Sequence, residues 1–175
     1  MFKRLERELS YQGKILQVYT DRVEVNGRPS NWDFIHHDGG AAVVPITKEG
    51  KILMVRQYRN ALERFTLEIP AGALDSPEET GLACVIRELE EETGYRAGHV
   101  EWLVTIHSWP AFVDEQVEIF VATDLVPTEQ KFDEEECIEL EEYTIEELKE
   151  KIFSGEIKDS KTVAGLLAYA AKYRE

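Results

Sequence analysis

One stretch, residues 72–95, constrains this chain more than any other, because helix signals mark both of its ends. Ser76 is a favourable helix cap, and Glu79 follows it by three residues, as in a capping box. Gly94 suits the position just after a helix, where glycine takes the left-handed conformation without strain. The sequence therefore predicts a helix over residues 77–93.

The predicted helix has an apolar stripe. Apolar side chains and one threonine recur along it at helical spacing, at Leu82, Val85, Ile86, Leu89 and Thr93. We expect this stripe to pack against the core, since such a periodicity is typical of a helix that covers a sheet with one face.

Three carboxylates lie on a neighbouring stripe of the same helix, because Glu88, Glu91 and Glu92 are spaced i, i+3 and i+4. Like charges at this spacing repel each other unless a cation lies among them. Hard oxygen ligands in a cluster suit Mg²⁺ or Mn²⁺. The alternative is a solvated acidic helix face, which a glutamate-rich run taken alone favours.

The wider pattern resembles the signature of the Nudix hydrolases, a long motif of charged, apolar and glycine positions. It opens with Gly72, where we expect a turn conformation that other residues resist. It continues with Glu79 and ends in the run Arg87-Glu88-Leu89-x-Glu91-Glu92-x-Gly94-Tyr95. Six residues separate Gly72 from Glu79, one more than in the family pattern. We place the extra residue in the loop at Asp75-Ser76-Pro77, with Glu78 as the alternative for the first glutamate.

Further stretches narrow the resemblance to the branch of ADP-ribose pyrophosphatases and nucleoside diphosphate sugar hydrolases. They are the N-terminal strand segments, Arg56-Gln-Tyr-Arg59, Glu68-Ile-Pro-Ala-Gly72, Pro110 and Asp159-Ser-Lys-Thr162. Ala111 stands after that proline where similar enzymes often have glycine. The resemblance implies Mg²⁺-dependent hydrolysis of ADP-ribose to AMP and ribose 5-phosphate. The alternatives are a GDP-mannose or UDP-glucose type of substrate, and a nucleotide sensor without catalysis.

The metal ligands implied by this resemblance lie in the motif and just before it. Glu88 and Glu92 are the first choices, Glu91 follows closely, and the carbonyl of Ala71 completes the set. Arg87 is expected to orient a helix carboxylate such as Glu79, and so to act on the ligands indirectly.

The general base is expected outside the helix. By resemblance to this branch, an acidic loop supplies it, and Glu134 and Glu136 are the candidates. The alternative for both is a solvated loop with a run of like charges.

Substrate contacts are expected from several other segments. Arg59 and Arg56 suit phosphate groups, because a planar guanidinium binds them with two hydrogen bonds, although Arg56 also fits a surface strand charge. Glu68 and Glu115 are suggested contacts to ribose hydroxyls or metal-bound water. The candidates for stacking on the base are Trp32, Tyr19 and Trp109, each of which also fits core packing.

Residues 1–38 form a separate N-terminal β module by pattern, followed by a Nudix hydrolase domain over residues 39–175. Short alternating segments at residues 15–19 and 22–25 precede Asn26-Gly27, a strong hairpin signal. Such a sheet has little core of its own, so it must pack on something else, and a partner subunit is a candidate. The resemblance implies a homodimer in which this module contributes substrate contacts. His36-His37 invite a metal hypothesis, but an ordinary role at the end of a strand is favoured.

The order of elements in the rest of the chain predicts an α+β or α/β sandwich with the sheet packed between helices. The resemblance implies the Nudix fold, an α+β fold in which an α/β/α sandwich has a mixed central sheet between helices. Strands are expected at residues 42–46, 51–59, 100–107 and 116–123, and residues 66–72 lead the chain into the motif. Thr144 and Glu147 form a second capping box, for a helix that ends near Gly155, and a last helix spans residues 159–173.

Composition limits the partners. The 175 residues carry 35 acidic and 20 basic side chains, a formal net charge of −15, which argues against a nucleic acid partner. A small phosphorylated substrate is compatible with this charge when a metal ion inverts the local field.

Cys84 and Cys137 have no disulfide or zinc spacing and are expected to be reduced. Without a leader or a long apolar run, the expected compartment is the cytoplasm, with no membrane contact.

Overall fold

The computed structural model describes residues 1–128 and 138–173. The chain forms two compact units. The first consists of Met1–Gly39 and His107–Gln116, and the second of Gly40–Ile106 and Val117–Glu175. Each unit is described by itself below.

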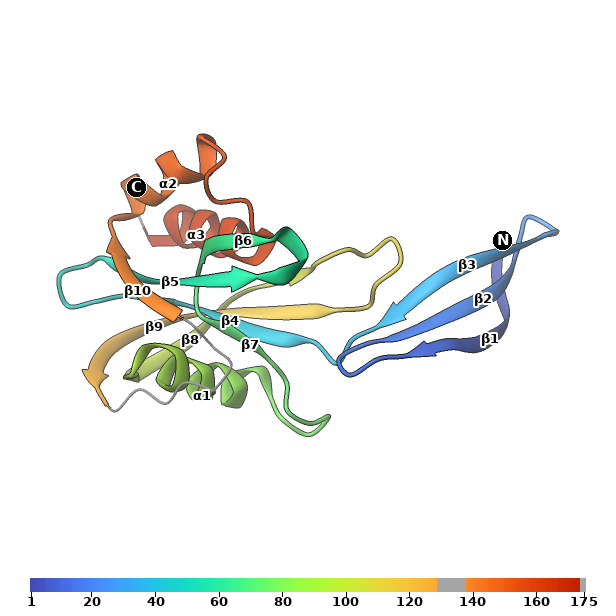
Figure 1. Ribbon diagram of the computed structural model, residues 1–175, viewed down its shortest axis with the longest axis horizontal. Helices are drawn as coiled ribbons and strands as arrows, with labels where there is room; N and C mark the ends of the chain where they lie inside the picture. The colour runs from blue at the N-terminus through green and yellow to red at the C-terminus, as the bar shows by residue number, and fades with distance from the viewer. Residues whose placement is uncertain (129–137, 174–175) are drawn as a thin grey trace. The chain divides into compact units, whose positions relative to one another are not determined.

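The first unit is a three-stranded antiparallel sheet of β1 (Phe2–Gln12), β2 (Gln17–Val25) and β3 (Arg28–His36), coloured blue in Figure 1. The hairpin predicted at Asn26-Gly27 is confirmed: Val25 pairs with Arg28, and the two turn residues have φ of 53° and 78°. The two segments expected at residues 15–19 and 22–25 belong to the one continuous strand β2.

The sheet of the first unit has very little core. Val23 is the one fully buried apolar side chain of this unit, all of whose residues the structure describes. Large apolar side chains are instead exposed, at Phe2, Leu5, Leu9, Tyr11, Ile15 and Trp32. The unit therefore gains little stability from burial within its own chain.

The second unit contains a four-stranded sheet in the order β7-β4-β9-β8. Its strands are β4 (Gly40–Pro45), β7 (Ala71–Ala73), β8 (Tyr95–His107) and β9 (Gln116–Pro127). Strand β4 pairs with β9 in parallel and with β7 in antiparallel, which confirms a mixed sheet. The stretch 66–72, which leads into the motif, is divided between β7 and a strand of a second sheet.

This second sheet has the order β10-β5-β6. It consists of β5 (Ile52–Arg59), β6 (Arg64–Glu68) and β10 (Ile138–Tyr143), with the short 3-10 helix η1 (Asn60–Leu62) between β5 and β6. Strand β10 was not predicted, because three of its six residues are glutamates. Its alternation places Leu140 opposite Val55, and the cross-strand pairing with β5 overrides the low strand propensity of glutamate.

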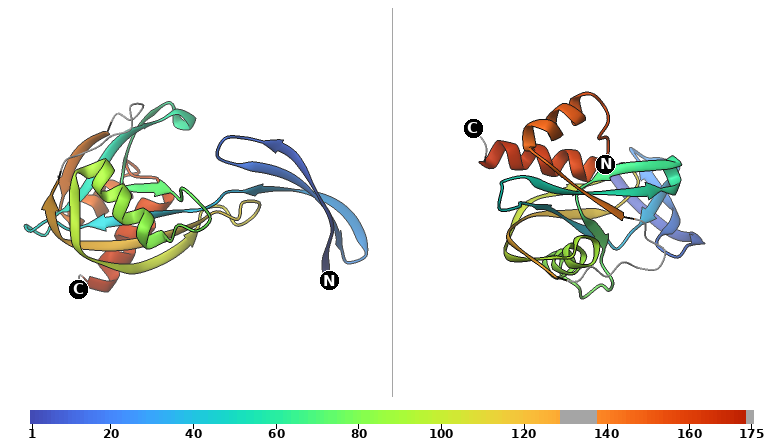
Figure 2. Two further views of the ribbon diagram at one scale, coloured as in Figure 1. Left: turned by 90° about the horizontal axis from the view of Figure 1, so that it is seen from below. Right: turned by 60° about the vertical axis from the view of Figure 1, so that its left-hand side comes forward.

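Two apolar cores lie on opposite faces of the sheet β7-β4-β9-β8. Ala41 and Val43 of β4 pack with α1 (Gly81–Thr93) on one face. Ala42 and Val44 pack on the other face, in a core shared with β5, α2 (Ile145–Phe153) and α3 (Ser160–Tyr173). Figures 1 and 2 show α1 and α3 on opposite sides of this sheet. The layered α+β arrangement is as predicted.

Helix α1 begins at Gly81, four residues later than the sequence predicted, and the proposed cap at Ser76 is wrong. The cap is Thr80, whose side-chain oxygen accepts a hydrogen bond from the Ala83 N–H at 3.2 Å. Glu79 cannot complete a capping box because its carboxylate is bonded elsewhere, as described below. Gly94 ends the helix as predicted, with φ of 68° and its N–H bonded to the Glu90 carbonyl.

The apolar stripe of α1 is rotated from the predicted one. Val85, Leu89 and Thr93 are buried as expected, but Leu82 and Ile86 are 44% and 42% exposed. The buried face of the helix instead includes Gly81, Cys84 and Glu92. The helix is turned in this way because two of its glutamates contact β7, as the site geometry shows.

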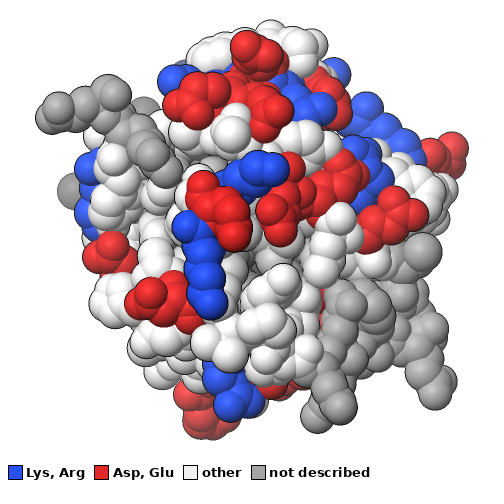
Figure 3. Space-filling model, turned by 90° about the vertical axis from the view of Figure 1, so that its left-hand side faces the viewer, with Lys and Arg blue, Asp and Glu red and all other residues white. Residues whose placement is uncertain are grey.

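The C-terminal helices follow the predicted signals. Both bonds of the capping box between Thr144 and Glu147 are present at the start of α2, and Gly155 follows the helix with φ of 79°. Among the described residues, no helix has the length and apolar character required to cross a membrane. Figure 3 shows acidic and basic side chains intermixed on one face of the molecule.

Candidate functional site

Gly72 and Glu88 are in close contact where β7 meets α1. A Cβ atom added to Gly72 would lie 1.8 Å from Glu88 Oε1 and 2.7 Å from its Cγ. Gly72 pairs with Ala41 in the sheet and is not among the glycines with positive φ, so the expected turn conformation is wrong. Glycine is required here because the Glu88 side chain occupies the space that any larger residue would fill.

Glu92 lies one turn further along α1 and is directed to the same strand. It is 3% exposed, and its Oε2 accepts a hydrogen bond from the Ala71 N–H at 2.9 Å. The structure thus brings Ala71, Glu88 and Glu92 together from two segments of the chain. A carboxylate this deeply buried needs compensating hydrogen bonds or charge.

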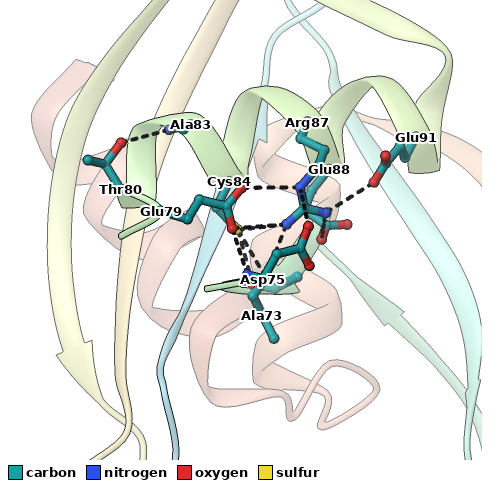
Figure 4. A network of polar contacts seen from close by, with 10 residues as sticks. Ala73, Asp75, Glu79, Thr80, Ala83, Cys84, Arg87, Glu88 and Glu91 are labelled. Atoms are coloured by element: carbon teal, nitrogen blue, oxygen red, sulfur yellow. Dashed lines mark hydrogen bonds and ion pairs between the residues drawn. The ribbon is translucent and has the colours of Figure 1, made fainter. Parts of the chain in front are cut away.

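Arg87 is the centre of a polar network at this junction (Figure 4). Its Nε lies 3.2 Å from Glu79 Oε1 and 3.2 Å from Asp75 Oδ2. Its Nη1 lies 2.6 Å from Glu88 Oε1 and 3.1 Å from Glu91 Oε2. Burial lowers the pKa of Arg87, but hydrogen bonds to Glu79 and Glu88 outweigh it, so the pKa is raised and the guanidinium stays charged.

The network has an excess of negative charge. One guanidinium faces the four carboxylates of Asp75, Glu79, Glu88 and Glu91. Glu92 adds a fifth carboxylate at the same junction, where it accepts a hydrogen bond from Ala71 of β7. Clustered carboxylate oxygens are hard donors that fit a divalent cation such as Mg²⁺.

Within residues 1–128 and 138–173, no group of three His, Cys, Asp or Glu side chains is arranged to hold a metal ion. Glu88 and Glu91 are turned to Arg87, and Glu92 is turned to the Ala71 N–H. Metal binding at this junction would therefore require rotation of these side chains about their own bonds.

Cys84 is buried next to this network and adds no charge to it. Its Sγ is within 3.4 Å of the Ala73 carbonyl and 3.6 Å of the Gly72 carbonyl. Burial raises the pKa of the thiol to about 12, so the side chain is a neutral thiol at physiological pH.

Arg59 and Glu68, both expected at the substrate, form a bidentate ion pair with each other. Arg59 Nε and Nη2 donate to the two carboxylate oxygens at 2.9 and 2.7 Å. Glu68 is 2% exposed and also accepts hydrogen bonds from Lys161 and from the Thr66 hydroxyl. Burial raises the pKa of Glu68, but its partners Arg59 and Lys161 lower it further, to about 2.

Arg56 is also engaged in a pair, because its Nε donates to Glu141 of β10. Glu141 is a diagonal neighbour of Arg56 across the β5–β10 ladder, because Arg56 lies opposite Glu139, and both side chains are partly buried. The geometry matches the alternative of a strand charge that is neutralised across the sheet.

Glu115 and Trp32 belong to the first unit. Glu115 accepts a hydrogen bond from Ser108 and lies 3.5 Å from His37 Nδ1. Trp32 is 48% exposed, stacks on Phe2 at 5.2 Å, and borders a cavity of about 540 Å³ that also touches Ala111 and Phe112. Trp32 is thus a surface aromatic rather than a core residue.

The other two aromatic candidates differ in exposure. Tyr19 is partly buried against Phe34 at 5.8 Å and under the Arg7 guanidinium. Trp109 is 62% exposed and contacts Phe112 at 5.5 Å.

The histidine pair is bonded to the loop that follows β8. His36 Nδ1 lies 2.8 Å from Asp114 Oδ2, and the backbone N–H of His37 donates to Asp114 Oδ1 at 3.1 Å. Asp114 raises the pKa of His36 through this hydrogen bond. The contacts tie the end of β3 to the loop.

Two of the predicted catalytic residues, Glu134 and Glu136, lie outside the described residues. Asp75, Asp114 and Lys161 also belong to these networks, but the sequence did not predict it. Their signals were weak, since Asp75 lies in the inserted loop and Lys161 was noted for the resemblance of its segment alone. Contacts of this kind depend on tertiary packing and leave no periodicity in the sequence.

Comparison with known proteins identifies the family. The NUDIX domain matches residues 36–165. ADP-ribose pyrophosphatase of Bacillus subtilis (strain 168) is 40% identical over 98% of this chain and 91% of its own length. Methanol dehydrogenase activator of Bacillus methanolicus is 40% identical over 92% of this chain and 88% of its own.

The fold also matches a solved structure. A crystal structure of an ADP compounds hydrolase superposes with a TM-score of 0.86 at 21% identity, covering 99% of this chain and 97% of that one. The matched domain includes the junction of β7 and α1, with all three motif glutamates. The chain therefore belongs to the Nudix hydrolase family.

Proposed function

We propose that this protein is a Mg²⁺-dependent hydrolase that splits ADP-ribose into AMP and ribose 5-phosphate. The observation that carries the proposal is the convergence of Glu88 and Glu92 on the Ala71-Gly72 backbone, in a network with more carboxylates than cations. The name of the Bacillus subtilis relative supports ADP-ribose as the substrate. Mn²⁺ is a chemically equivalent cofactor for the same oxygen ligands.

The metal would be held by Glu88 and Glu92, with Glu91 and the Ala71 carbonyl as further ligands. When bound, such an ion neutralises phosphate charge and lowers the pKa of bound water. Arg87 serves this arrangement by keeping Glu88 and Glu91 close together at the junction, from which their carboxylates can rotate to a metal ion, while Glu79 holds Arg87.

Water must lose a proton as it attacks phosphorus, and we assign this proton to Glu134 or Glu136. The assignment is supported by the acidic sequence of residues 133–136 and by the resemblance of that loop to the branch. Replacing each glutamate by glutamine separately would distinguish the base from its neighbour.

Arg59, and after it Arg56, would contact the phosphates. Arg59 is the stronger candidate because its partner Glu68 has a second cation, whereas Arg56 is held by Glu141. Contacts to the ribose or the base would come from Glu115 and Trp32, and Glu68 would act mainly through Arg59.

We further propose a cytoplasmic homodimer in which residues 1–38 provide the dimer contact and part of the substrate site, while residues 39–175 form the Nudix hydrolase domain. The support is the exposed apolar surface of the first unit, since large apolar patches of this kind commonly mark protein interfaces.

Product analysis tests the proposed substrate. ADP-ribose, GDP-mannose and UDP-glucose are incubated with the protein in Mg²⁺ and in excess chelator, and the products are separated by chromatography. We expect AMP and ribose 5-phosphate from ADP-ribose, in Mg²⁺ only, and slower cleavage of the two sugar nucleotides. Faster cleavage of a sugar nucleotide would make that compound the preferred substrate in place of ADP-ribose. No cleavage of any of the three would favour a nucleotide sensor without catalysis.

A further inference from the structure

The buried carboxylate of Glu68 has two cationic partners. Arg59 binds both of its oxygens, and Lys161 Nζ binds Oε2. Glu68 is 2% exposed, so its charge cannot be compensated by water. At least one of the two cations must therefore stay in place whenever the carboxylate is ionised.

Lys161 is the more firmly held of the two. Its side chain is 15% exposed and also donates to Asp159 Oδ2 at 2.9 Å. Asp159 in turn accepts hydrogen bonds from the backbone and hydroxyl of Thr162, and the Thr162 hydroxyl accepts one from the Ile69 N–H. This chain of bonds fixes the start of α3 to the segment between β6 and β7.

Arg59 is less constrained. Its side chain is 40% exposed, and it uses Nε and Nη2 for Glu68, while no described residue accepts a hydrogen bond from Nη1. Arginine can exchange a carboxylate for a phosphate without changing its hydrogen-bonding geometry, because both present two oxygens at similar spacing.

A cavity of about 420 Å³ adjoins this pair. Four cationic side chains line it, at Arg59, Arg64, Lys158 and Lys161, together with the three carboxylates of Glu68, Glu156 and Asp159. Neither Arg64 nor Lys158 has an ion-pair partner in the described part of the chain. In a protein with a net charge of −15, a cavity with more cations than carboxylates favours an anionic group.

We propose that Lys161 is a positioning residue that allows Arg59 to bind a substrate phosphate. Lys161 keeps the charge of Glu68 compensated while Arg59 exchanges Glu68 for a phosphate group at the cavity. Without Lys161, Arg59 can reach the phosphate only by leaving a buried carboxylate unpaired, which is strongly unfavourable. This inference rests on the proposed function, because it takes a nucleoside diphosphate compound as the ligand.

Affinity for ADP-ribose tests the proposal. Calorimetry in excess chelator measures the Kd without hydrolysis, and steady-state kinetics in Mg²⁺ gives KM and kcat. We expect Lys161→Met to raise Kd and KM by about tenfold or more, because a charge-assisted contact is lost, with kcat within about threefold. Lys161→Arg should stay close to wild type. Lys172→Met, a change of the same kind at the exposed end of α3, is the matched control.

A double variant separates positioning from a structural role. Lys161→Met combined with Glu68→Gln removes the carboxylate together with its fixed counter-ion, so Arg59 is released and the Kd should return to within about threefold of wild type. Thermal denaturation of each variant shows whether it is folded.

Two results would overturn the inference: a Kd for Lys161→Met equal to that of wild type, and a weakened Kd that the double variant does not restore. Absence of any ADP-ribose binding to wild type would overturn it as well. A wild-type protein that binds ADP-ribose without cleaving it, with the expected Kd pattern, would contradict the proposed catalysis and support the role of Lys161.

Discussion

At the scale of single residues, the site depends on the absence of a side chain at Gly72. Gly72 leaves the space that the Glu88 carboxylate fills, and Arg87 then links that carboxylate to Glu79 and Glu91. The glycine was identified from the motif, but the reason given for it was backbone freedom. Steric contact between distant segments is a tertiary property, and no local pattern reveals it.

Replacing Gly72 by alanine tests this contact. The new methyl group would meet Glu88 Oε1, Cδ and Cγ at 1.8, 2.0 and 2.7 Å, so the glutamate must adopt another rotamer. We expect turnover of ADP-ribose to fall by about tenfold or more, while the free energy of unfolding changes by less than about 1 kcal/mol. Turnover equal to that of wild type would show that the position of Glu88 against β7 is not needed.

At the scale of elements, the start of α1 shows where sequence signals compete. Ser76 and Thr80 are both acceptable caps, and the sequence favoured Ser76 because Glu79 follows it by three residues. The structure uses Glu79 for Arg87 instead, so the helix begins after Thr80. A local signal was outweighed by an ion pair between residues that are eight positions apart in the sequence.

Two alanine variants distinguish these caps. Thr80→Ala removes the hydrogen bond to the Ala83 N–H and should lower the free energy of unfolding by about 1 kcal/mol in a urea titration. Ser76→Ala is the matched control, since its side chain forms no hydrogen bond with the described residues, and should change stability by less than about 0.5 kcal/mol. The reverse order of the two losses would place the cap at Ser76.

Glu68 joins three elements, because its partners Arg59, Thr66 and Lys161 lie on β5, β6 and α3. Its pKa of about 2 in the folded chain is below the ordinary value of 4.5. A lowered pKa stabilises the fold at pH above the unfolded value, and this contribution is lost as the pH falls from 4.5 toward 2.

At pH 7, Glu68→Gln should therefore lower the free energy of unfolding by roughly 3 kcal/mol. At pH 2 the loss should be small, because at least about half of the wild-type Glu68 carboxyl groups are protonated there. Urea titrations of both proteins across this range measure the difference. A difference that is equally large at pH 7 and at the lowest pH would show that packing, and not the charge of Glu68, ties these elements together.

At the scale of the whole molecule, the order of strands and helices was largely predictable from turn signals and periodicity. The N-terminal hairpin and both C-terminal helices were found in this way, and the family resemblance implied the mixed sheet. Strand β10 and the partition into two sheets were not, because pairing across the sheet decides them. The partners of Arg56, Arg59 and Glu68 were missed for the same reason, since they come from segments far apart in the sequence.

The exposed apolar surface of the first unit leads to a prediction for the assembly. Sedimentation of the full chain should give a dimer, and deletion of residues 1–38 should give a monomer, because the apolar side chains of β1 are then removed. A truncated chain that is folded and still dimeric would place the interface in the second unit.

Turnover of ADP-ribose by two variants of α1 tests the central claim most directly. Glu92→Gln keeps the size of the side chain and its contact with the Ala71 N–H but removes the charge, whereas Glu90→Gln makes the same change on the same helix, in a residue paired with Arg96. We predict that Glu92→Gln lowers kcat about 100-fold or more and that Glu90→Gln stays within about twofold of wild type. Equal activity of the two variants would contradict the assignment of Glu92 to the metal site.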